Sequence, residues 1–402
     1  MRNRRAFFTF FFLITSCVLA GSVSAQIQFS IPKNLRPVQF NQKFDISSWN
    51  HYNSVEGLFA GVDGTLVPFP QKRLAFSGGA GYGFASKTPR FHFYTIASFG
   101  NQNAVKLGAG FFNHTAANEK WLIGEIENSF AAILLHEEFM DYYGLKGWQG
   151  WAQFRLKNWI TLRGLFQSAD YKSCRKETDW SLYPNKRRKF RPNPAVRSGK
   201  ENLFRMSLIV DRLDNPIYPM AGFYLQVAAE KALPSSEAQF QDYSGFFSTF
   251  RWFQPAAGNQ KISVRVRGAA VFHADFLPQH LIDFGGIGTL QAYHYKAFKN
   301  VSAVLLGRVV YGFEGDLMSS ALFSWIPFSD MLELSVFAEA GKGWFPSAGP
   351  SFRAAEHEST PLKYDGGVSF SISGDLIRVD LGHPVNEKNG QWRVTLRVLP
   401  KW

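Results

Sequence analysis

The feature that most constrains the fold is a recurring alternation of apolar and polar residues over segments of about ten residues. The clearest instance is 391–400, where every second residue from Trp392 to Val398 is apolar and Arg393 and Arg397 lie between them. Successive side chains of a β-strand point to opposite faces of a sheet. The alternation therefore predicts many short strands, each with one apolar and one polar face.

Fifteen segments of the chain follow this pattern and are separated by turn residues. The expected strands are 54–67, 72–85, 89–99, 103–113, 147–156, 159–168, 203–213, 222–231, 243–254, 261–273, 302–313, 332–344, 363–373, 375–383 and 391–400. A single-chain bacterial barrel has an even number of strands, so a sixteenth strand is expected.

Two segments are candidates for the sixteenth strand, 121–135 and 318–326. We favour 121–135 as the fifth strand, because the long connections 169–202, 274–301 and 345–362 then all follow odd strands and lie outside the cell. Residues 129–135 could equally form one or two helical turns.

Composition separates the remaining fold classes. The 402 residues are 46% hydrophobic and 16% aromatic and include 35 glycines. The mean hydropathy is nevertheless only -0.15. No apolar run of about 18 residues follows the N-terminus, which excludes a helical membrane protein. An aromatic-rich chain whose apolar residues alternate with polar ones is typical of an all-β, transmembrane antiparallel barrel.

The N-terminus predicts export. Residues 1–25 begin with Arg2, Arg4 and Arg5, continue with an apolar stretch and end in small residues, as a cleavable secretory signal does. A lipoprotein box ending at Cys17 is the alternative. We expect 26–53 to be a short periplasmic segment and 54–402 to form the barrel. Because Cys17 leaves with the signal, Cys174 would remain alone and no internal disulfide is expected.

No pattern of catalytic or metal-binding residues emerges. The run "HEEFMDYY" (136–143) begins like a zinc-protease helix, but Met140 stands where the second histidine is needed. A nucleophile elbow, G-x-S-x-G, does not occur. We therefore expect a protein that is not an enzyme, without catalytic residues, metal or cofactor. The basic run 185–194 would meet anionic lipid head groups or other polyanions on an outer loop, or is simply solvated, and nucleic acid is not expected as a partner.

The stretch "FGGIGTLQAYHYKAF" (284–298) is rich in glycine without being a phosphate loop. Such a loop follows a strand and opens a helix, whereas a β-prone run follows Gly288 here. Glycine also permits sharp turns in places where a Cβ atom would clash. We therefore predict an outer loop that folds back into a narrow lumen.

This stretch resembles the lid-loop motif of the BamA/TamA superfamily of outer-membrane barrels, the bacterial surface antigen family, in which a glycine pair is followed by [LV]-R-G-[FY]. Three further segments resemble family motifs in the expected order: "DRLDNPIYPMAGFYLQV" (211–227), "VFAEAGKGW" (336–344) and "LIRVDLGHPV" (376–385). The resemblance implies about sixteen strands, a lateral seam between the first and last strands, and an extracellular lid loop, 274–301, folded into the lumen. The lid motif would be Gly285, Gly286, Gly288, Leu290, Gln291, Ala292 and Tyr293.

The chain departs from the family pattern at the lid. Gln291 and Ala292 stand where the family has Arg and Gly, and Glu339 stands at the acid with which that Arg pairs. The resemblance implies that Glu339, with Arg265 and Arg267 nearby, holds the lid from the lumen wall. A glutamine donates only a neutral hydrogen bond, so the lid would be held less tightly than by arginine.

Two function classes follow. The first is a barrel of outer-membrane biogenesis or transport; because only about fifteen residues separate Gln26 from Asn41, its POTRA-type periplasmic domains would belong to a separate partner. The second is a non-translocating structural or surface-interaction barrel, or a plugged pore. In both cases we expect the protein to contact outer-membrane lipids and lipopolysaccharide. We also expect the barrel assembly machinery to recognise the last strand, which ends at Trp402.

Overall fold

The structure is a computed structural model. It describes residues 44–398 apart from 70–72, 183–188, 217, 259, 274–276, 314–331, 347–357, 373–376 and 388. The expected signal (1–25), the candidate strand 318–326 and Trp402 lie outside the described residues.

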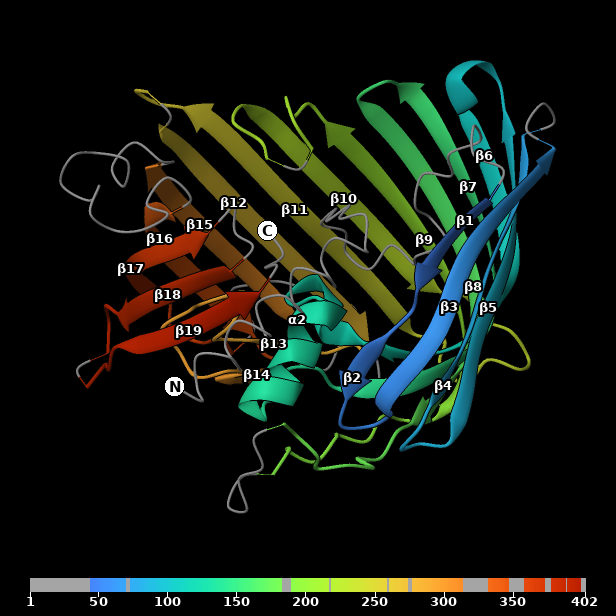
Figure 1. Ribbon diagram of the computed structural model, residues 1–402, viewed down its shortest axis with the longest axis horizontal. Coiled ribbons are helices and arrows are strands. Elements are labelled where there is room, and N and C mark those ends of the chain that lie inside the picture. Colours follow the sequence, from blue (N-terminus) through green and yellow to red (C-terminus); the bar gives the residue numbers. More distant parts are fainter. Residues whose placement is uncertain are drawn as a thin grey trace, which may run out of the picture.

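Almost all regular structure is β, and Figure 1 labels the elements. The strands are β1 (Phe44–Ser48), β2 (His51–Asn53), β3 (Gly57–Phe69), β4 (Leu74–Gly83), β5 (Thr88–Phe99), β6 (Val105–Ala117), β7 (Tyr142–Lys157), β8 (Ile160–Ser173), β9 (Gly199–Asp211), β10 (Gly222–Ala232), β11 (Tyr243–Pro255), β12 (Gln260–His273), β13 (Ile282–Phe284), β14 (Phe298–Val301), β15 (Ala303–Phe313), β16 (Leu332–Trp344), β17 (Lys363–Ile372), β18 (Ile377–Pro384) and β19 (Arg393–Val398). The helical elements are η3 (Asn101–Asn103), η4 (Asn118–Trp121), α2 (Glu125–Phe130) and η5 (Ala131–Leu135).

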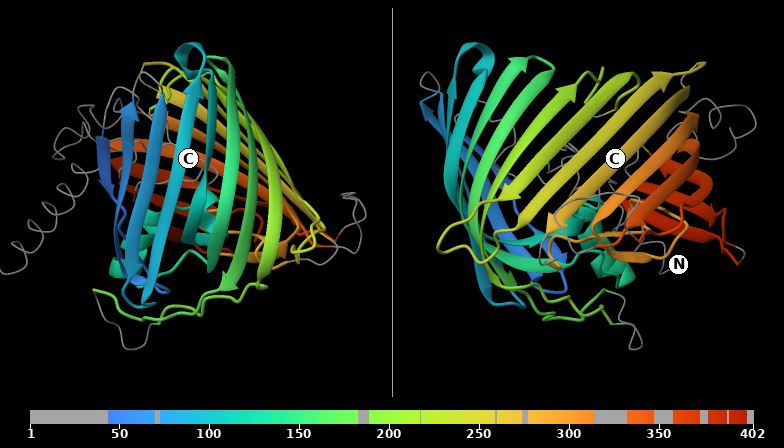
Figure 2. Two further views of the ribbon diagram at one scale, coloured as in Figure 1. Left: turned by 90° about the vertical axis from the view of Figure 1, so that its right-hand side faces the viewer. Right: turned by 180° about the vertical axis from the view of Figure 1, so that it is seen from behind.

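In the described part of the chain, seventeen strands form one antiparallel sheet, and β13 and β14 form a separate hairpin. β1 and β2 pair with successive stretches of β3, so together they occupy one position. From β3 onward each strand pairs with the next along the chain, except that β12 pairs with β15. The sheet therefore has sixteen positions and wraps into the barrel wall seen in Figures 1 and 2.

All fifteen segments with period-2 alternation are strands, so that prediction is confirmed. The choice of 121–135 as a strand is wrong, because this segment forms η4, α2 and η5. Ile126 and Phe130, four residues apart, lie on one face of α2. The missing position is instead filled by β1 and β2, within the range expected to be a periplasmic segment.

The two ends of the wall differ in the length of their connections. Counted from β1 and β2, the connections after odd positions include 118–141, 174–198 and the one between β12 and β15, whereas β7 and β8 are joined by two residues, 158–159. From β7 onward each strand has the odd or even position that the sequence predicted. The structure has one more strand position before β3 than predicted and one fewer at 121–135, so the two differences cancel. Figure 2 shows α2 with the hairpin of β13 and β14 at the lower end of the wall.

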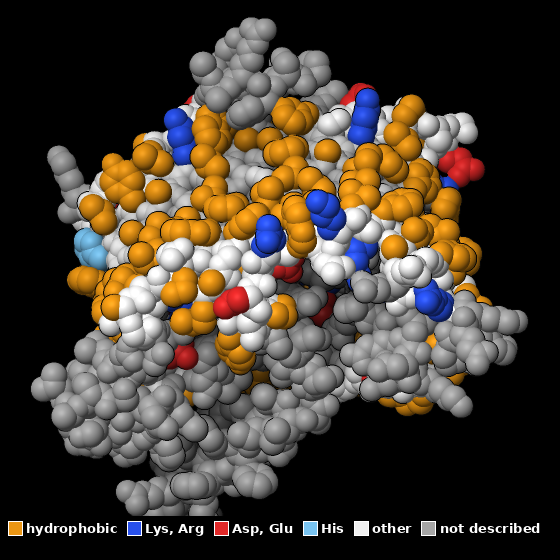
Figure 3. Space-filling model, turned by 90° about the horizontal axis from the view of Figure 1, so that it is seen from above, with side chains coloured by type: hydrophobic (Ala, Val, Ile, Leu, Met, Phe, Trp, Pro, Cys, Tyr) orange, Lys and Arg blue, Asp and Glu red, His pale blue; other side chains and the backbone are white. Residues whose placement is uncertain are grey.

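The two faces of the wall differ in polarity. On β5, Phe91 and Phe93 are 42% and 51% exposed, whereas His92 and Tyr94 are buried on the inner face. Hydrophobic side chains dominate the face shown in Figure 3, with scattered lysine and arginine. The outside is thus a mostly apolar surface and the inside holds most of the buried polar groups.

No described helix has the length and apolar character needed to cross a membrane.

The wall is open between its first and last positions. No backbone pairing joins β19 to β1 or β2 within the described residues. α2 lies beside this seam in Figure 1. Its Ser129 Oγ accepts a hydrogen bond of 2.9 Å from the backbone N–H of Tyr52 on β2, and its Glu127 pairs with Arg397 on β19 at 2.6 Å. Residues 118–135 contain η4, α2 and η5, and we call them the helical segment. The helical segment thus contacts both edges of the seam.

Candidate functional site

The connection between β12 and β15 is described from residue 277 to 302, and we call it the glycine-rich loop. Gly285, Gly286 and Gly288 have φ angles of 106°, 75° and 82°, which favour glycine over residues with a Cβ atom. A Cβ on Gly286 would lie 2.6 Å from the Cα of Tyr295, so the two ends of the turn touch. The backbone N–H of Gly286 donates to Leu290 O at 2.8 Å, which closes the turn.

A hairpin supports this turn and buries it. Phe284 of β13 stacks on Phe298 of β14, with ring centroids 4.7 Å apart. Leu290 is fully buried in a cluster that also includes Val304 and Leu306 of the wall. The loop is therefore packed against the barrel interior and shares an apolar core with it.

The tip of the loop is held by carboxylates of three neighbouring strands. The backbone N–H of Gln291 donates to Glu339 of β16 at 2.7 Å, and that of Ala292 donates to Asp365 of β17 at 2.7 Å. The side-chain Nε2 of Gln291 donates to Asp380 of β18 at 3.1 Å. All five residues are buried, so these bonds are shielded from water.

Gln291 contacts Glu339 through its backbone N–H and not through its side chain. The cation beside Glu339 is Arg308 of β15, at 2.8 Å, and it also lies 3.7 Å from Asp380. Arg308 is therefore the arginine that pairs with Glu339, whereas the sequence suggested Arg265 and Arg267 for this role. This cation explains how Glu339 remains buried although Gln291 carries no charge.

The two arginines expected as lumen partners contact other groups. Arg265 donates to the backbone O of Gly288 at 3.4 Å, so it does touch the loop. The Arg267 guanidinium lies 5.3 Å from the ring centroid of Trp121, in the helical segment. Tyr293, the last residue of the expected motif, donates to Asn386 Oδ1 at 2.9 Å beyond β18.

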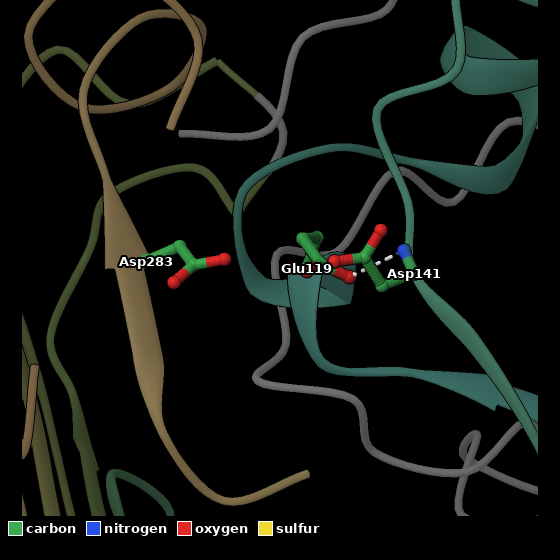
Figure 4. Close-up of side chains that lie close together, drawn as sticks. All are labelled: Glu119, Asp141 and Asp283. Carbon is green, nitrogen blue, oxygen red and sulfur yellow. Dashed lines mark hydrogen bonds between the residues drawn. The ribbon is translucent and has the colours of Figure 1, made fainter. Parts of the chain in front are cut away.

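A second anchor joins the loop to the helical segment. Lys296 Nζ lies 2.5 Å from Glu119, 2.5 Å from Asp141 and 2.9 Å from Asp283. Figure 4 shows these three carboxylates, which come from η4, the segment before β7, and β13. Burial alone would lower the pKa of Lys296, but the three carboxylates outweigh it and raise that pKa. The charged Lys296 therefore joins the glycine-rich loop to Glu119 of η4 and to Asp141 before β7 through ion pairs.

The same three carboxylates have the spacing of a metal site, since their oxygen atoms lie within 4.8 Å of one another. Oxygen ligands of this kind suit Mg²⁺ or Ca²⁺. Lys296 already supplies a positive charge at ion-pair distance from each carboxylate, so we describe the cluster as an ion-pair network.

The run 136–143 serves the fold of the helical segment. Glu138 accepts a hydrogen bond of 2.8 Å from the backbone N–H of Ser54, which precedes β3. Tyr295 of the glycine-rich loop donates to the backbone O of Phe139. Cys174 is half-buried and packs beside this segment. Of the basic run, Lys189 to Pro194 are described, and Arg191 donates to the backbone O of Met140 at 2.9 Å.

Sequence reasoning missed several residues of the site, namely Arg308, Asp365, Asp380, Glu119 and Asp141. Arg308 and Asp365 lie directly opposite Glu339 on the neighbouring strands. Their alternation onto the polar face could have identified them, once the strands were aligned. Nothing in the sequence aligned Lys296 with Glu119, because they are far apart in the chain.

Comparisons with known proteins give one family model and several solved structures. A family model described as the C-terminal domain of a family of unknown function, DUF5686, matches residues 32–208. No curated protein sequence matches the chain. Among solved structures, BamA from Haemophilus ducreyi lacking POTRA domains 1–3 has a TM-score of 0.60 and 11% identity, over 89% of this chain and 70% of that chain.

Two further solved structures are CdiB from Acinetobacter baumannii and CdiB from Escherichia coli. Their TM-scores are 0.44 and 0.45, their identities 8% and 11%, and each match covers 89% of this chain and 60% or 62% of the other. At 11% identity the BamA likeness concerns the fold alone. It agrees with the sixteen-position antiparallel wall built above from strand pairing.

Proposed function

We propose that this protein is an outer-membrane β-barrel that acts in outer-membrane biogenesis or transport together with a separate periplasmic partner of POTRA type. The observation that carries the proposal is the seam between β19 and β2. Both edges contact α2 from within, and the glycine-rich loop is anchored beside it on β16, β17 and β18. An open seam next to an internal anchored loop offers a place where a substrate segment can pair with a free strand edge.

The same proposal assigns the location. Residues 1–25 act as the export signal, and the barrel assembly machinery recognises the last strand and Trp402. The apolar outer face, with residues such as Phe91 and Phe111, supports contact with membrane lipids, including lipopolysaccharide. The end that carries the glycine-rich loop faces the outside of the cell, so the loop is a lid that enters the lumen from there.

Cysteine labelling tests the location and orientation. In a Cys174→Ser background, Arg175→Cys places a thiol on the connection after β8, and Asn158→Cys places one in the turn between β7 and β8. Both native residues are exposed. An impermeant thiol reagent should label the first variant in intact cells and the second only after the outer membrane is disrupted. The reverse result, or recovery of the chain in the soluble periplasm, would overturn the assignment.

Depletion tests the activity. Loss of the protein should lower the abundance of at least one other outer-membrane component, and the wild-type chain should restore it. The Glu339→Gln variant removes a carboxylate that holds the loop tip and should restore less, although it still inserts. Glu237→Gln, at an exposed pair with Lys200, is the matched control. An unchanged outer-membrane composition after depletion would contradict biogenesis or transport.

The second candidate function is a plugged, non-translocating barrel. The buried hydrogen bonds from Gln291 and Ala292 to the wall support it, because they stabilise a filled lumen. A plugged pore should conduct little in a planar bilayer, and Glu339→Gln should raise its conductance. This reading is preferred if depletion changes no other outer-membrane component.

A further inference from the structure

The inner wall formed by β11 and β12 carries arginines opposite one another on neighbouring strands. Arg251 on β11 pairs in register with Arg265 on β12, and Arg265 pairs in register with Arg308 on β15. Like charges directly opposite each other destabilise an antiparallel pair. The charge of Arg308 is balanced by Glu339. Arg251 and Arg265 form no ion pair of this kind within the described residues.

Neither of these two arginines lies at ion-pair distance from a carboxylate in the described part of the chain, and the charges of Asp211 and Glu339 act on Arg251 and Arg265 only from farther away. Arg251 is 7% exposed, and its Nε atom has no hydrogen-bond partner. Its guanidinium lies 4.5 Å from the ring centroid of Tyr224. The hydrogen bond of Arg265 goes to a neutral backbone oxygen, that of Gly288. A buried charge without a counter-charge is costly, so an anion bound here would lower the free energy of the folded protein.

Two neighbours complete a binding surface. Thr249 lies two residues before Arg251 on the same face of β11, is 2% exposed, and its Oγ1 atom has no hydrogen-bond partner. Arg267 on β12 pairs in register with Thr249 and is 4% exposed. Thr249, Arg251, Arg265 and Arg267 thus place one hydroxyl and three guanidinium groups on adjacent strands. We call these four residues the β11–β12 patch.

We propose that the β11–β12 patch binds a phosphate-bearing ligand. A guanidinium presents a planar fork of N–H donors that matches the oxygen atoms of a phosphate, and several forks on one wall suit a group with more than one negative charge. A single carboxylate would balance only one of the arginines. The ligand is a phosphate monoester or pyrophosphate group, either free or on a lipid.

Binding to the purified full-length chain in a neutral detergent tests this site, whether or not the proposed function holds. Calorimetric titration uses inorganic pyrophosphate in one arm and a short-chain phosphatidic acid in the other. We expect saturable binding that weakens as NaCl is added. Binding only of pyrophosphate identifies a free phosphate ligand, binding only of the lipid identifies a head group, and binding of both identifies the shared chemistry.

Variants locate the site. Arg251→Gln and Arg265→Gln should each weaken binding by about tenfold or more, because a charge-assisted hydrogen bond is lost. Thr249→Val should weaken it less. Arg90→Gln is the matched control, because Arg90 on β5 also lies buried on the inner face but forms an ion pair with Glu56 at 2.9 Å. This control should bind like the wild type.

A stability measurement separates binding from a merely structural role. Pyrophosphate should raise the temperature at which the wild-type chain unfolds on a heat-modifiability gel. Arg251→Gln should unfold at a higher temperature than the wild type in anion-free buffer, because the like-charge contact is relieved, and should gain nothing from pyrophosphate. If this variant does not fold, Arg251→Lys replaces it and should bind more weakly than the wild type. Absence of saturable binding in both arms, or equal weakening in Arg90→Gln, would overturn the site.

Discussion

Arg397 on β19 and Glu127 on α2 form a buried bidentate ion pair. Arg397 Nε lies 2.6 Å from Glu127 Oε1, and the NH2 nitrogen of Arg397 lies 3.0 Å from Oε2. Their side chains are 1% and 3% exposed. Because α2 also bonds to Tyr52 on β2, this pair is half of a link across the unpaired seam. The seam is thus bridged by side chains of α2 and not by backbone pairing between β19 and β2.

Removing one partner of this pair should be costly. Glu127→Gln leaves the Arg397 charge buried without its counter-charge, and we expect the free energy of unfolding to fall by about 3–5 kcal/mol. Urea titration of the protein in lipid bilayers measures it. Glu237→Gln, at the exposed pair with Lys200, should leave the free energy nearly unchanged. Equal effects of the two variants would show that the α2 link contributes nothing to the fold.

The turn of the glycine-rich loop makes a second prediction. Gly286→Ala introduces a Cβ at positive φ and 2.6 Å from the Cα of Tyr295, so the turn must open. We expect faster proteolysis within the loop and an unchanged barrel. Gly307→Ala on β15 is the control, because a Cβ there meets no atom within 4 Å. Identical proteolysis of both variants would mean that the turn does not hold the loop.

The wall was largely predictable from sequence, because period-2 alternation reports directly on a sheet with one apolar face. The errors arose where that signal is weak. The segment 121–135 is apolar enough for a strand, but its residues pack inside the barrel, where Glu127 finds Arg397. β1 is exposed along its whole length, so its apolar residues Phe44 and Ile46 do not mark a face that turns towards the barrel interior.

The site was predictable only in part. The glycines of the loop and the inward position of Glu339 follow from local rules on φ and strand alternation. The partners of the loop depend on three-dimensional register. Arg308 is the cation beside Glu339 because the two lie opposite each other on β15 and β16. No local rule joins Gln291 to Asp380, since the contact depends on how deeply the loop enters the lumen.

The side chain and the backbone of Gln291 have different partners, which a double-mutant analysis can separate. Gln291→Ala removes the bond from Nε2 to Asp380 but keeps the backbone bond to Glu339. We expect a loss of about 1–3 kcal/mol in the free energy of unfolding. The effect should be non-additive with Asp380→Asn and more nearly additive with Glu339→Gln. Stronger coupling to Glu339 than to Asp380 would mean that the side chain, not the backbone, reaches β16.

Glu56, in the turn before β3, makes stability depend on acid. Burial would raise its pKa, but hydrogen bonds and charge from His51, with bonds from Thr115 and Arg90, lower it to about 2. A depressed carboxyl pKa stabilises the fold above the unfolded value of 4.5, and this contribution disappears as pH falls towards 2. It is on the order of 3 kcal/mol. Urea titrations at pH 7, 4 and 2.5 should show this loss in the wild type, and Glu56→Gln should be less stable at pH 7 but lose less below pH 4.5.

Lys296 gives a prediction with the opposite pH dependence. In the wild type its pKa is raised, so its contribution is complete below the unfolded pKa of 10.5 and is lost only as pH rises through the folded value. Between pH 7 and pH 5 the lysine itself therefore adds no change. Lys296→Met leaves Glu119, Asp141 and Asp283 facing one another without their cation.

Such a variant should lose about 3–5 kcal/mol in the free energy of unfolding at pH 7, because three carboxylates now repel one another and Glu119 is buried. Burial, with the neighbouring charge of Asp141, holds the pKa of Glu119 above its ordinary value in the folded state, so the folded variant binds a proton there more readily than the unfolded chain. Lowering the pH to 5 should then restore part of the loss, and Glu119→Gln in the same background should restore part of it at pH 7. Lys200→Met, at the exposed pair with Glu237, is the control and should show neither effect. The ion pairs of Lys296 would not hold the loop if Lys296→Met were equally stable at pH 7 and pH 5 and Glu119→Gln gave no rescue. The loop would then be attached to the helical segment by the hydrogen bond of Tyr295 and by apolar packing.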